Sequence, residues 1–100
     1  MIEGIQNKIL EGKYEFSQHA LDQMIKRRIL TREIRESISQ GEIIEDYPDD
    51  KYGASCLIFG LTLNHRALHL LCSYPTRPLI KVITVYEPDL QDWLDYRYRR

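Results

Sequence analysis

Polar side chains suited to phosphodiester chemistry lie near the amino end of the chain. His19, Gln23 and Arg27 follow one another at four-residue steps, so a helix would place them on one side. Histidine can take or give a proton near neutral pH, and arginine can neutralise charge that develops on phosphorus. We expect Lys26 to add a weaker electrostatic contribution. The alternative is that His19 is an exposed surface histidine near a helix start.

A second polar group is expected on neighbouring strands. His69 interrupts the apolar segment Leu68–Leu71, and the predicted pairing places it on the same sheet face as Thr84 and Tyr86. Such a group can bind a ligand, and a tyrosine can stack on a base or donate to a phosphate oxygen. The alternatives are a half-buried histidine whose hydrogen bonds are satisfied inside the fold, and a Tyr86 that packs beside Trp93.

Charge is distributed unevenly although the net charge is only −1. Basic residues concentrate between positions 26 and 35, acidic residues between 42 and 50, and basic residues again at 97–100. Basic patches attract phosphates even in a protein of near-zero net charge. The alternative is that each cluster is a solvated face. The aromatic and basic tail from Tyr96 to Arg100 is typical of single-stranded nucleic-acid binding, and also of frayed chain ends.

Length and composition exclude several classes of protein. The chain has 100 residues, of which 43% are apolar and 29% charged, so we expect one globular domain over residues 1–100. No apolar run approaches the ~20 residues that cross a bilayer, and no secretory leader is visible, which predicts a cytoplasmic protein without membrane contact. Two cysteines cannot hold the fold together. Zinc and glycine-rich phosphate-loop motifs are absent, so we expect no metal, dinucleotide or other cofactor.

The periodicity predicts an α+β fold. We expect N-terminal helices packed on one face of a three- to four-stranded antiparallel meander sheet, followed by a short C-terminal helix. The first helix ends at Gly12. The second covers 18–27 with Ser17 as N-cap and an apolar side of Ala20, Leu21, Met24 and Ile25; the third covers 32–40 with Thr31 as N-cap. The predicted strands are 42–46, 56–63, 66–74 and 79–86, and the last helix begins at Pro88 with Leu90, Trp93 and Leu94 inward.

The predicted strand pairing depends on a two-residue turn at Asn64-His65. This turn would pair Leu57 with Cys72 and Phe59 with Leu70. One sheet face would then be apolar and packed on the helices: Leu57, Phe59, Leu61, Leu68, Leu70, Ile83 and Val85. The other would carry Gly60, His69, Thr84 and Tyr86, among Ile58, Leu71 and Val82. Cys56 and Cys72 would point to opposite faces, which argues against a disulfide.

Four segments of the chain together resemble a known bacterial family. They are Phe16–Ala20 with the following Met24, Arg27 and Ile29; Gly41–Pro48; Arg66–His69; and Ile83–Pro88. In this order they resemble the domain-of-unknown-function family 4258, over about residues 14–93. The resemblance implies a helix-then-sheet domain similar to the RelE, BrnT and MqsR toxins, which cleave RNA without a metal. It also implies a partner antitoxin, with the zinc-finger MqsA type as the candidate.

The resemblance extends to individual residues. His19 and Arg27 fall on the helix motif, His69 on a strand motif, and Thr84 and Tyr86 on the last-strand motif. Two positions depart from the family pattern, which usually has an arginine in place of Gln23 and a helix-ending glycine in place of Arg28. The first departure removes a phosphate-binding cation, and the second removes a residue that tolerates a left-handed cap.

These observations leave two main hypotheses. The first is an endoribonuclease toxin in which His19 and His69 transfer protons, Arg27 stabilises the transition state and Tyr86 orients the RNA, with Lys26 and Thr84 as further substrate contacts. The second is a non-catalytic protein-interaction module, or a degenerate toxin relative, that binds a small partner protein. A small-ligand sensor is a third hypothesis with no specific sequence feature behind it.

Overall fold

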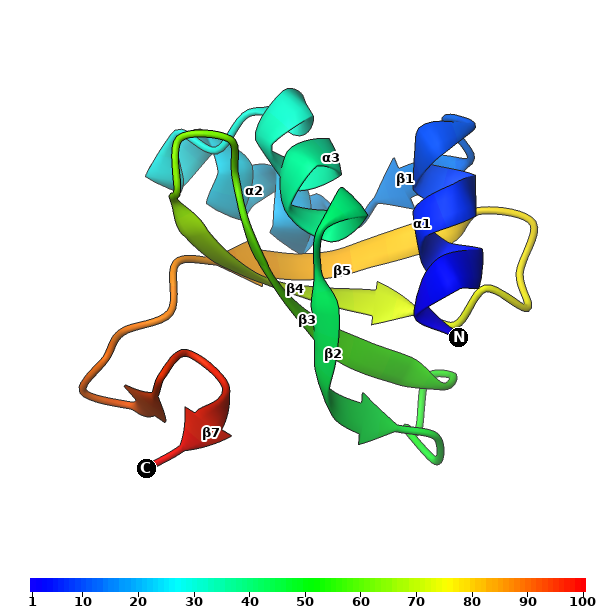
Figure 1. Ribbon diagram of the computed structural model, residues 1–100. Coiled ribbons are helices and arrows are strands. Elements are labelled where there is room, and N and C mark those ends of the chain that lie inside the picture. Colours follow the sequence, from blue (N-terminus) through cyan, green and yellow to red (C-terminus); the bar gives the residue numbers. More distant parts are fainter.

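The computed structural model describes all 100 residues and has three helices above a five-stranded sheet (Figure 1). In chain order the elements are α1 (Ile2–Leu10), β1 (Tyr14–Phe16), α2 (Gln18–Arg27), α3 (Thr31–Ser39), β2 (Glu42–Tyr47), β3 (Ser55–Leu61), β4 (Ala67–Ser73), β5 (Ile80–Tyr86), β6 (Trp93–Leu94) and β7 (Tyr98–Arg99). The sheet order is β1-β5-β4-β3-β2, with β1 parallel to β5 and the other neighbours antiparallel. The α+β class is confirmed, and β1 supplies a strand that the periodicity did not predict.

The three predicted helices form because their apolar residues recur at helical spacing. Ser17 caps α2 as predicted, since its Oγ accepts a hydrogen bond from the Ala20 amide at 3.0 Å. Only Ala20 and Met24 of the predicted apolar side are buried; Leu21 and Ile25 are exposed. The N-cap of α3 is Leu30 rather than Thr31, and its amide donates to Oε1 of Glu33 at 2.9 Å.

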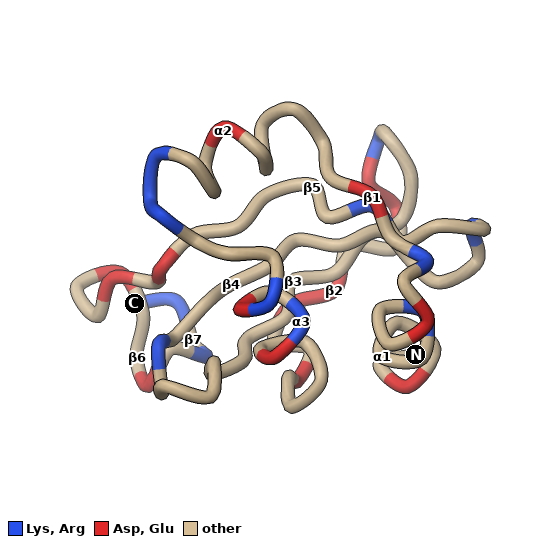
Figure 2. The backbone as a smooth tube through the Cα atoms, turned by 90° about the horizontal axis from the view of Figure 1, so that it is seen from above, with Lys and Arg blue, Asp and Glu red and all other residues tan.

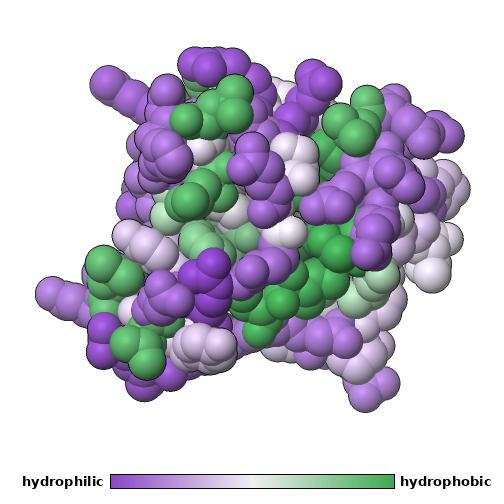
Figure 3. Space-filling model, in the orientation of Figure 1, coloured by the Kyte–Doolittle hydropathy of each residue, from purple (hydrophilic) through white to green (hydrophobic).

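The main core lies between the helices and one face of the sheet. Its members come from every helix and from β3, β4 and β5, and they include Ile5, Met24, Ile34, Ile58, Leu70 and Val85. Figure 3 shows from outside that hydrophobic atoms reach the surface chiefly in a band across the middle of this view, while polar side chains cover much of the periphery. No helix has the length and apolarity that a membrane crossing requires.

The predicted register between β3 and β4 is wrong by one residue. Leu57 pairs with Leu71 and Phe59 with His69, because the turn has three residues, 63–65, between the hydrogen-bonded pair Thr62 and Arg66, and not two. The Thr62 amide donates to the Arg66 carbonyl at 2.9 Å, and His65 takes a left-handed conformation (φ 63°). Such three-residue hairpins commonly contain one left-handed residue.

The one-residue slip exchanges the two faces of β3. Ile58 and Gly60 face the helices, whereas Leu57 and Phe59 lie on the open face with His69. Cys56 and Cys72 are therefore directly opposite each other on the helix side, both buried and both free, and not on opposite faces as predicted.

The predicted C-terminal helix is also wrong. After Pro88 the chain makes an Asp89-centred turn and then the β6–β7 hairpin, which lies below the sheet on the side away from the helices (Figure 1). Trp93 is buried as predicted, but Leu90 and Leu94 are exposed. The hairpin is stabilised on the open face of the sheet because Trp93 packs there and the neighbouring arginines pair with carboxylates of β2.

Gly60 provides a test of the corrected register. An added Cβ would clash with the Ser37 carbonyl group, because α3 lies directly on β3 at this point. We expect Gly60→Ala to lower the free energy of unfolding by about 2–3 kcal/mol in urea denaturation. Gly4→Ala is the control. Its Cβ would meet only the Pro75 side chain, at 3.1 Å, and alanine has a higher helix propensity than glycine in α1. Equal stability of the Gly60→Ala variant and the wild type would contradict this packing.

Candidate functional site

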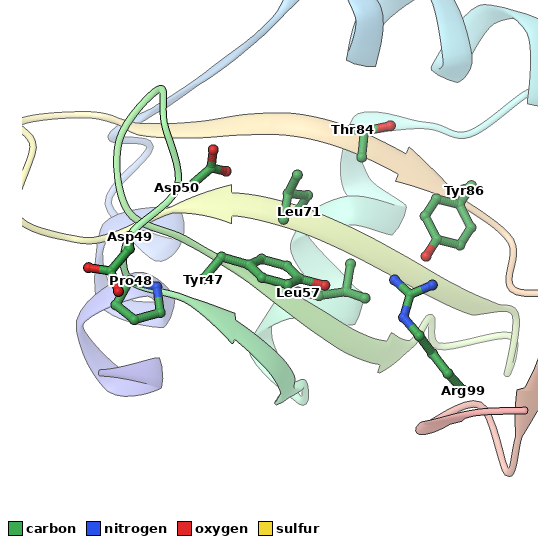
Figure 4. A pocket seen from close by; sticks show the side chains of 9 residues that line it. All are labelled: Tyr47, Pro48, Asp49, Asp50, Leu57, Leu71, Thr84, Tyr86 and Arg99. Carbon is green, nitrogen blue, oxygen red and sulfur yellow. The ribbon is translucent and has the colours of Figure 1, made fainter.

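The open face of the sheet carries a cavity of about 650 Å³. Leu57 and Leu71 form its apolar floor, and the loop Pro48–Asp50 lies at one end with Tyr86 and Arg99 at the other (Figure 4). A second hollow, lined partly by Trp93 and Arg100, shares Tyr86 and Arg99 with this cavity. We call the two together the groove.

Two strand bulges place the polar side chains of the groove. In β2 the pairing shifts between Ile43 and Glu45, so Ile44 is an extra residue and Glu45 returns to the open face opposite Leu57. In β5 the pairing shifts around Ile83. Bulges of this kind re-aim side chains and are common beside active sites.

His69 is fully buried and holds hydrogen bonds at both ring nitrogens. Nε2 lies 2.6 Å from the Tyr96 carbonyl oxygen, and Nδ1 lies 3.0 Å from the Tyr86 hydroxyl. A carbonyl oxygen can only accept, so the proton of the neutral ring is assigned to Nε2, and Nδ1 accepts from the Tyr86 O–H. Burial lowers the pKa of His69, and the opposing bond to the Tyr96 carbonyl does not overcome that effect. The neutral ring therefore fits this network.

The Tyr86 hydroxyl is held by His69 at the wall of the groove. The ring of His69 packs edge-on against Tyr86 and Trp93, with centroid separations of 5.2 and 4.5 Å. Burial raises the pKa of Tyr86 above its ordinary value, so the phenol keeps its proton at neutral pH. The site thus presents an oriented neutral hydroxyl.

Arg99 is the cation that lines both hollows of the groove. It forms two hydrogen bonds with Glu45, from Nε to Oε2 at 2.8 Å and from Nη2 to Oε1 at 3.0 Å, and its guanidinium lies 4.6 Å from the Trp93 ring centroid. Tyr47 donates to the same Oε1. Although burial opposes ionisation of Glu45, hydrogen bonds from Arg99 and Tyr47 hold its pKa below the ordinary value. Nη1 of Arg99 makes no bond to Glu45, and Figure 4 shows the guanidinium turned toward Tyr86.

The hairpin that carries Arg99 is anchored by charge as well as by burial. Arg97 pairs with Glu42 at 2.5 Å and lies over the Phe59 ring, on which Tyr96 also stacks. The sequence prediction placed Arg99 in a tail typical of nucleic-acid binding, but it did not assign Arg99, Glu45 or Tyr47 to the site with His69. The sequence feature that could have indicated these residues is the opposite charge of the segments 42–50, which is acidic, and 97–100, which is basic.

The structure brings together three of the predicted site residues. His69, Thr84 and Tyr86 share the open face, and Thr84 and Tyr86 line the cavity. Thr84 lies opposite Leu71 and makes no hydrogen bond to His69, whose partners are Tyr86 and Tyr96.

The remaining predicted residues lie elsewhere. His19, Lys26 and Arg27 belong to α2, which packs on the helix side of β5 through Ala20 and Met24, and none of them lines the groove. The sheet therefore separates His19 from His69, and the two do not form a proton-transfer pair. Nowhere in the structure do three His, Cys, Asp or Glu side chains converge in a way that could hold a metal ion.

The comparisons with known proteins identify a family. The sequence pattern of the family described as "Domain of unknown function (DUF4258)" matches residues 16–87, and the chain belongs to this family. The predicted family membership is thereby confirmed. No curated protein and no solved structure matches the chain. The matched segment contains His69, Thr84 and Tyr86 and ends before the β6–β7 hairpin.

The neutral state of His69 predicts a pH-dependent stability. The pKa of His69 is lower in the folded protein than in the unfolded chain, where it is about 6.5. At a pH below about 6.5 the unfolded chain therefore binds more protons than the folded protein, which favours unfolding. We expect the free energy of unfolding to decrease from pH 7 toward pH 5.5, and His69→Gln to flatten this part of the profile. Urea denaturation across this range measures the effect. An unchanged profile in His69→Gln would contradict the assignment.

Proposed function

We propose that the protein is an endoribonuclease of the toxin type, which cleaves RNA in the groove without needing a metal ion. One observation carries the proposal: the Tyr86 hydroxyl, held by a buried imidazole, stands at the wall of an open cavity beside Arg99. A proton-transfer group next to a cation is what cleavage of a phosphodiester by a neighbouring hydroxyl requires.

The surface of the groove suits a single RNA strand. Unpaired bases stack on aromatic rings, and Tyr47 and Tyr86 line the groove above an apolar floor. Arg99 and Arg100 stand beside these rings and provide positive charge for phosphates. Binding of this kind would leave a ribose and its phosphate near the Tyr86 hydroxyl.

The reaction follows from the hydrogen bond between Tyr86 and His69. Tyr86 Oη takes the proton of the ribose 2′-hydroxyl while its own proton moves to His69 Nδ1. The 2′-oxygen bonds to phosphorus, Arg99 neutralises the charge on the phosphate oxygens, and the bond to the 5′-oxygen breaks. The departing oxygen takes a proton from water, which leaves a 2′,3′-cyclic phosphate and a 5′-hydroxyl end. The proton on Nδ1 then returns through Tyr86 to solvent.

This proposal changes the roles that the sequence suggested. His69 acts through Tyr86 and does not touch the substrate, since it has no exposed surface. Thr84 stays a substrate contact, because it lines the cavity. His19, Lys26 and Arg27 take no part in bond cleavage. A small antitoxin protein that silences the enzyme would have to cover the groove.

Cleavage of RNA by the purified protein in the presence of a chelator tests the proposal. We expect Tyr86→Phe to lower the rate by about 10²–10⁴-fold, which is the usual contribution of a proton-transfer group. Arg99→Ala should also be strongly impaired, whereas His19→Ala should cleave like the wild type. An RNA with a 2′-deoxy sugar at the cleaved position should stay intact. Equal rates for Tyr86→Phe and the wild type would refute the mechanism.

A non-catalytic binding module is the second candidate, and the acidic end of the cavity favours it. Asp49 and Asp50 line that end and repel phosphates, whereas they would attract a basic segment of a partner protein. Expression in bacteria separates the two candidates. Growth arrest that disappears with Tyr86→Phe supports the enzyme, whereas harmless expression of the wild type supports the binding module.

A further inference from the structure

Three consecutive basic side chains at the end of α2 have no partner in the fold. Lys26, Arg27 and Arg28 are exposed, and none of them forms an ion pair. Figure 2 shows this basic segment as a continuous blue stretch at the left end of the molecule. We call these three residues the basic triplet.

The basic triplet lies close to the Tyr86 end of the groove. Arg66 bridges the two, because its Nη2 donates to the Arg27 carbonyl at 2.8 Å while its Nε donates to Glu87 at 3.0 Å. Glu87 directly follows Tyr86. The basic triplet and the β6–β7 hairpin lie at the same end of the molecule, on opposite sides of the sheet (Figure 1). Of the acidic groups nearby, Glu33 and Glu87 are paired with Arg66, and Asp22, one helical turn before Lys26, accepts a hydrogen bond from Gln18.

The backbone at Arg28 is unusual for an arginine. It adopts the left-handed conformation (φ 54°, ψ 50°) that ends α2, and glycine takes this conformation without strain. The cap itself uses only backbone groups, with the Arg28 amide donating to Ile25 and the Ile29 amide to Met24. The guanidinium of Arg28 makes no hydrogen bond, so the fold gains nothing from it. The exposed guanidinium of Arg28 is therefore available to a ligand.

We infer that the basic triplet is a second binding surface for RNA, which holds the phosphates of a strand leaving the groove past Tyr86. The strand would pass around the end of β5, from the open face to the helix side. The inference rests on the proposed function and adds to it a substrate longer than the groove. The ligand class is a flexible polyanion, because three exposed cations in a row contact successive phosphates without reading bases.

Binding of two RNA lengths tests this inference. The probes are fluorescently labelled 2′-O-methyl RNAs, which lack the attacking hydroxyl and are not cleaved: a trinucleotide that fills only the groove, and a strand of about twelve nucleotides. We expect Arg28→Gly to bind the longer RNA about two- to fivefold more weakly and the trinucleotide unchanged. The same variant should unfold about 2–8 °C higher, because glycine relieves the strain. A structural role for Arg28 would instead lower the unfolding temperature.

The control variant is Arg77→Ala, which removes one positive charge in the loop between β4 and β5, at the opposite end of the molecule (Figure 1). It should leave both affinities at the wild-type level. The triple variant Lys26→Ala, Arg27→Ala, Arg28→Gly should reduce the slope of log affinity against log salt by about 0.7 for each phosphate that the variant no longer neutralises.

The outcomes separate this inference from the proposed function. Wild-type affinity and salt dependence in the triple variant would overturn the second surface and leave the groove proposal standing. Equal weakening by Arg77→Ala would overturn it too, because the attraction would then be general. If the wild type binds neither RNA, both the proposed function and this extension fail.

Discussion

The buried imidazole of His69 is the interaction on which the rest of the open face depends. It has one proton and one lone pair to satisfy away from water, and leaving either unpaired would carry a desolvation penalty of about 1–3 kcal/mol. The Tyr96 carbonyl and the Tyr86 hydroxyl satisfy both. The bond to Tyr96 docks the C-terminal hairpin onto the sheet, and the bond to Tyr86 orients a phenol at the groove, so one imidazole serves both stability and site geometry.

The β6–β7 hairpin and the sheet each supply part of the site. The sheet supplies a carboxylate at Glu45, and the hairpin supplies the guanidinium of Arg99 and the Trp93 ring that packs on His69. Without the hairpin the sheet would expose Phe59 and His69, and without the sheet the hairpin would be a two-stranded ribbon that lacks a core. The groove is therefore a product of docking between a family-matched segment and a segment that follows it.

Sequence reasoning was most reliable where structure is local. The helices follow from repeated apolar residues, and the grouping of His69 with Thr84 and Tyr86 survived because alternation along β4 and β5 is a short-range property. The register of β3 could not be predicted in the same way. The register depends on whether the turn between β3 and β4 has two or three residues. The left-handed conformation of His65 is part of the three-residue turn.

The candidate site was only half predictable for a related reason. His19 and Arg27 have suitable chemistry and helical spacing, but spacing within one helix does not reveal which side of the sheet the helix covers. Arg99 was recognised only as part of a basic tail, because the segment after Pro88 was predicted to be a helix and forms a hairpin instead. The acidic and basic blocks pair across more than fifty residues, and only the folded chain shows that they meet.

The bulge at Ile44 has a consequence for how the protein behaves among other chains. β2 is an edge strand, and a regular edge offers unpaired backbone groups to any other chain that can add a strand. The extra residue in β2 interrupts the regular row of backbone hydrogen-bonding groups. Carboxylates also line this strand, at Glu42, Glu45 and Asp46. The irregularity that shapes the groove thereby also discourages edge-to-edge aggregation.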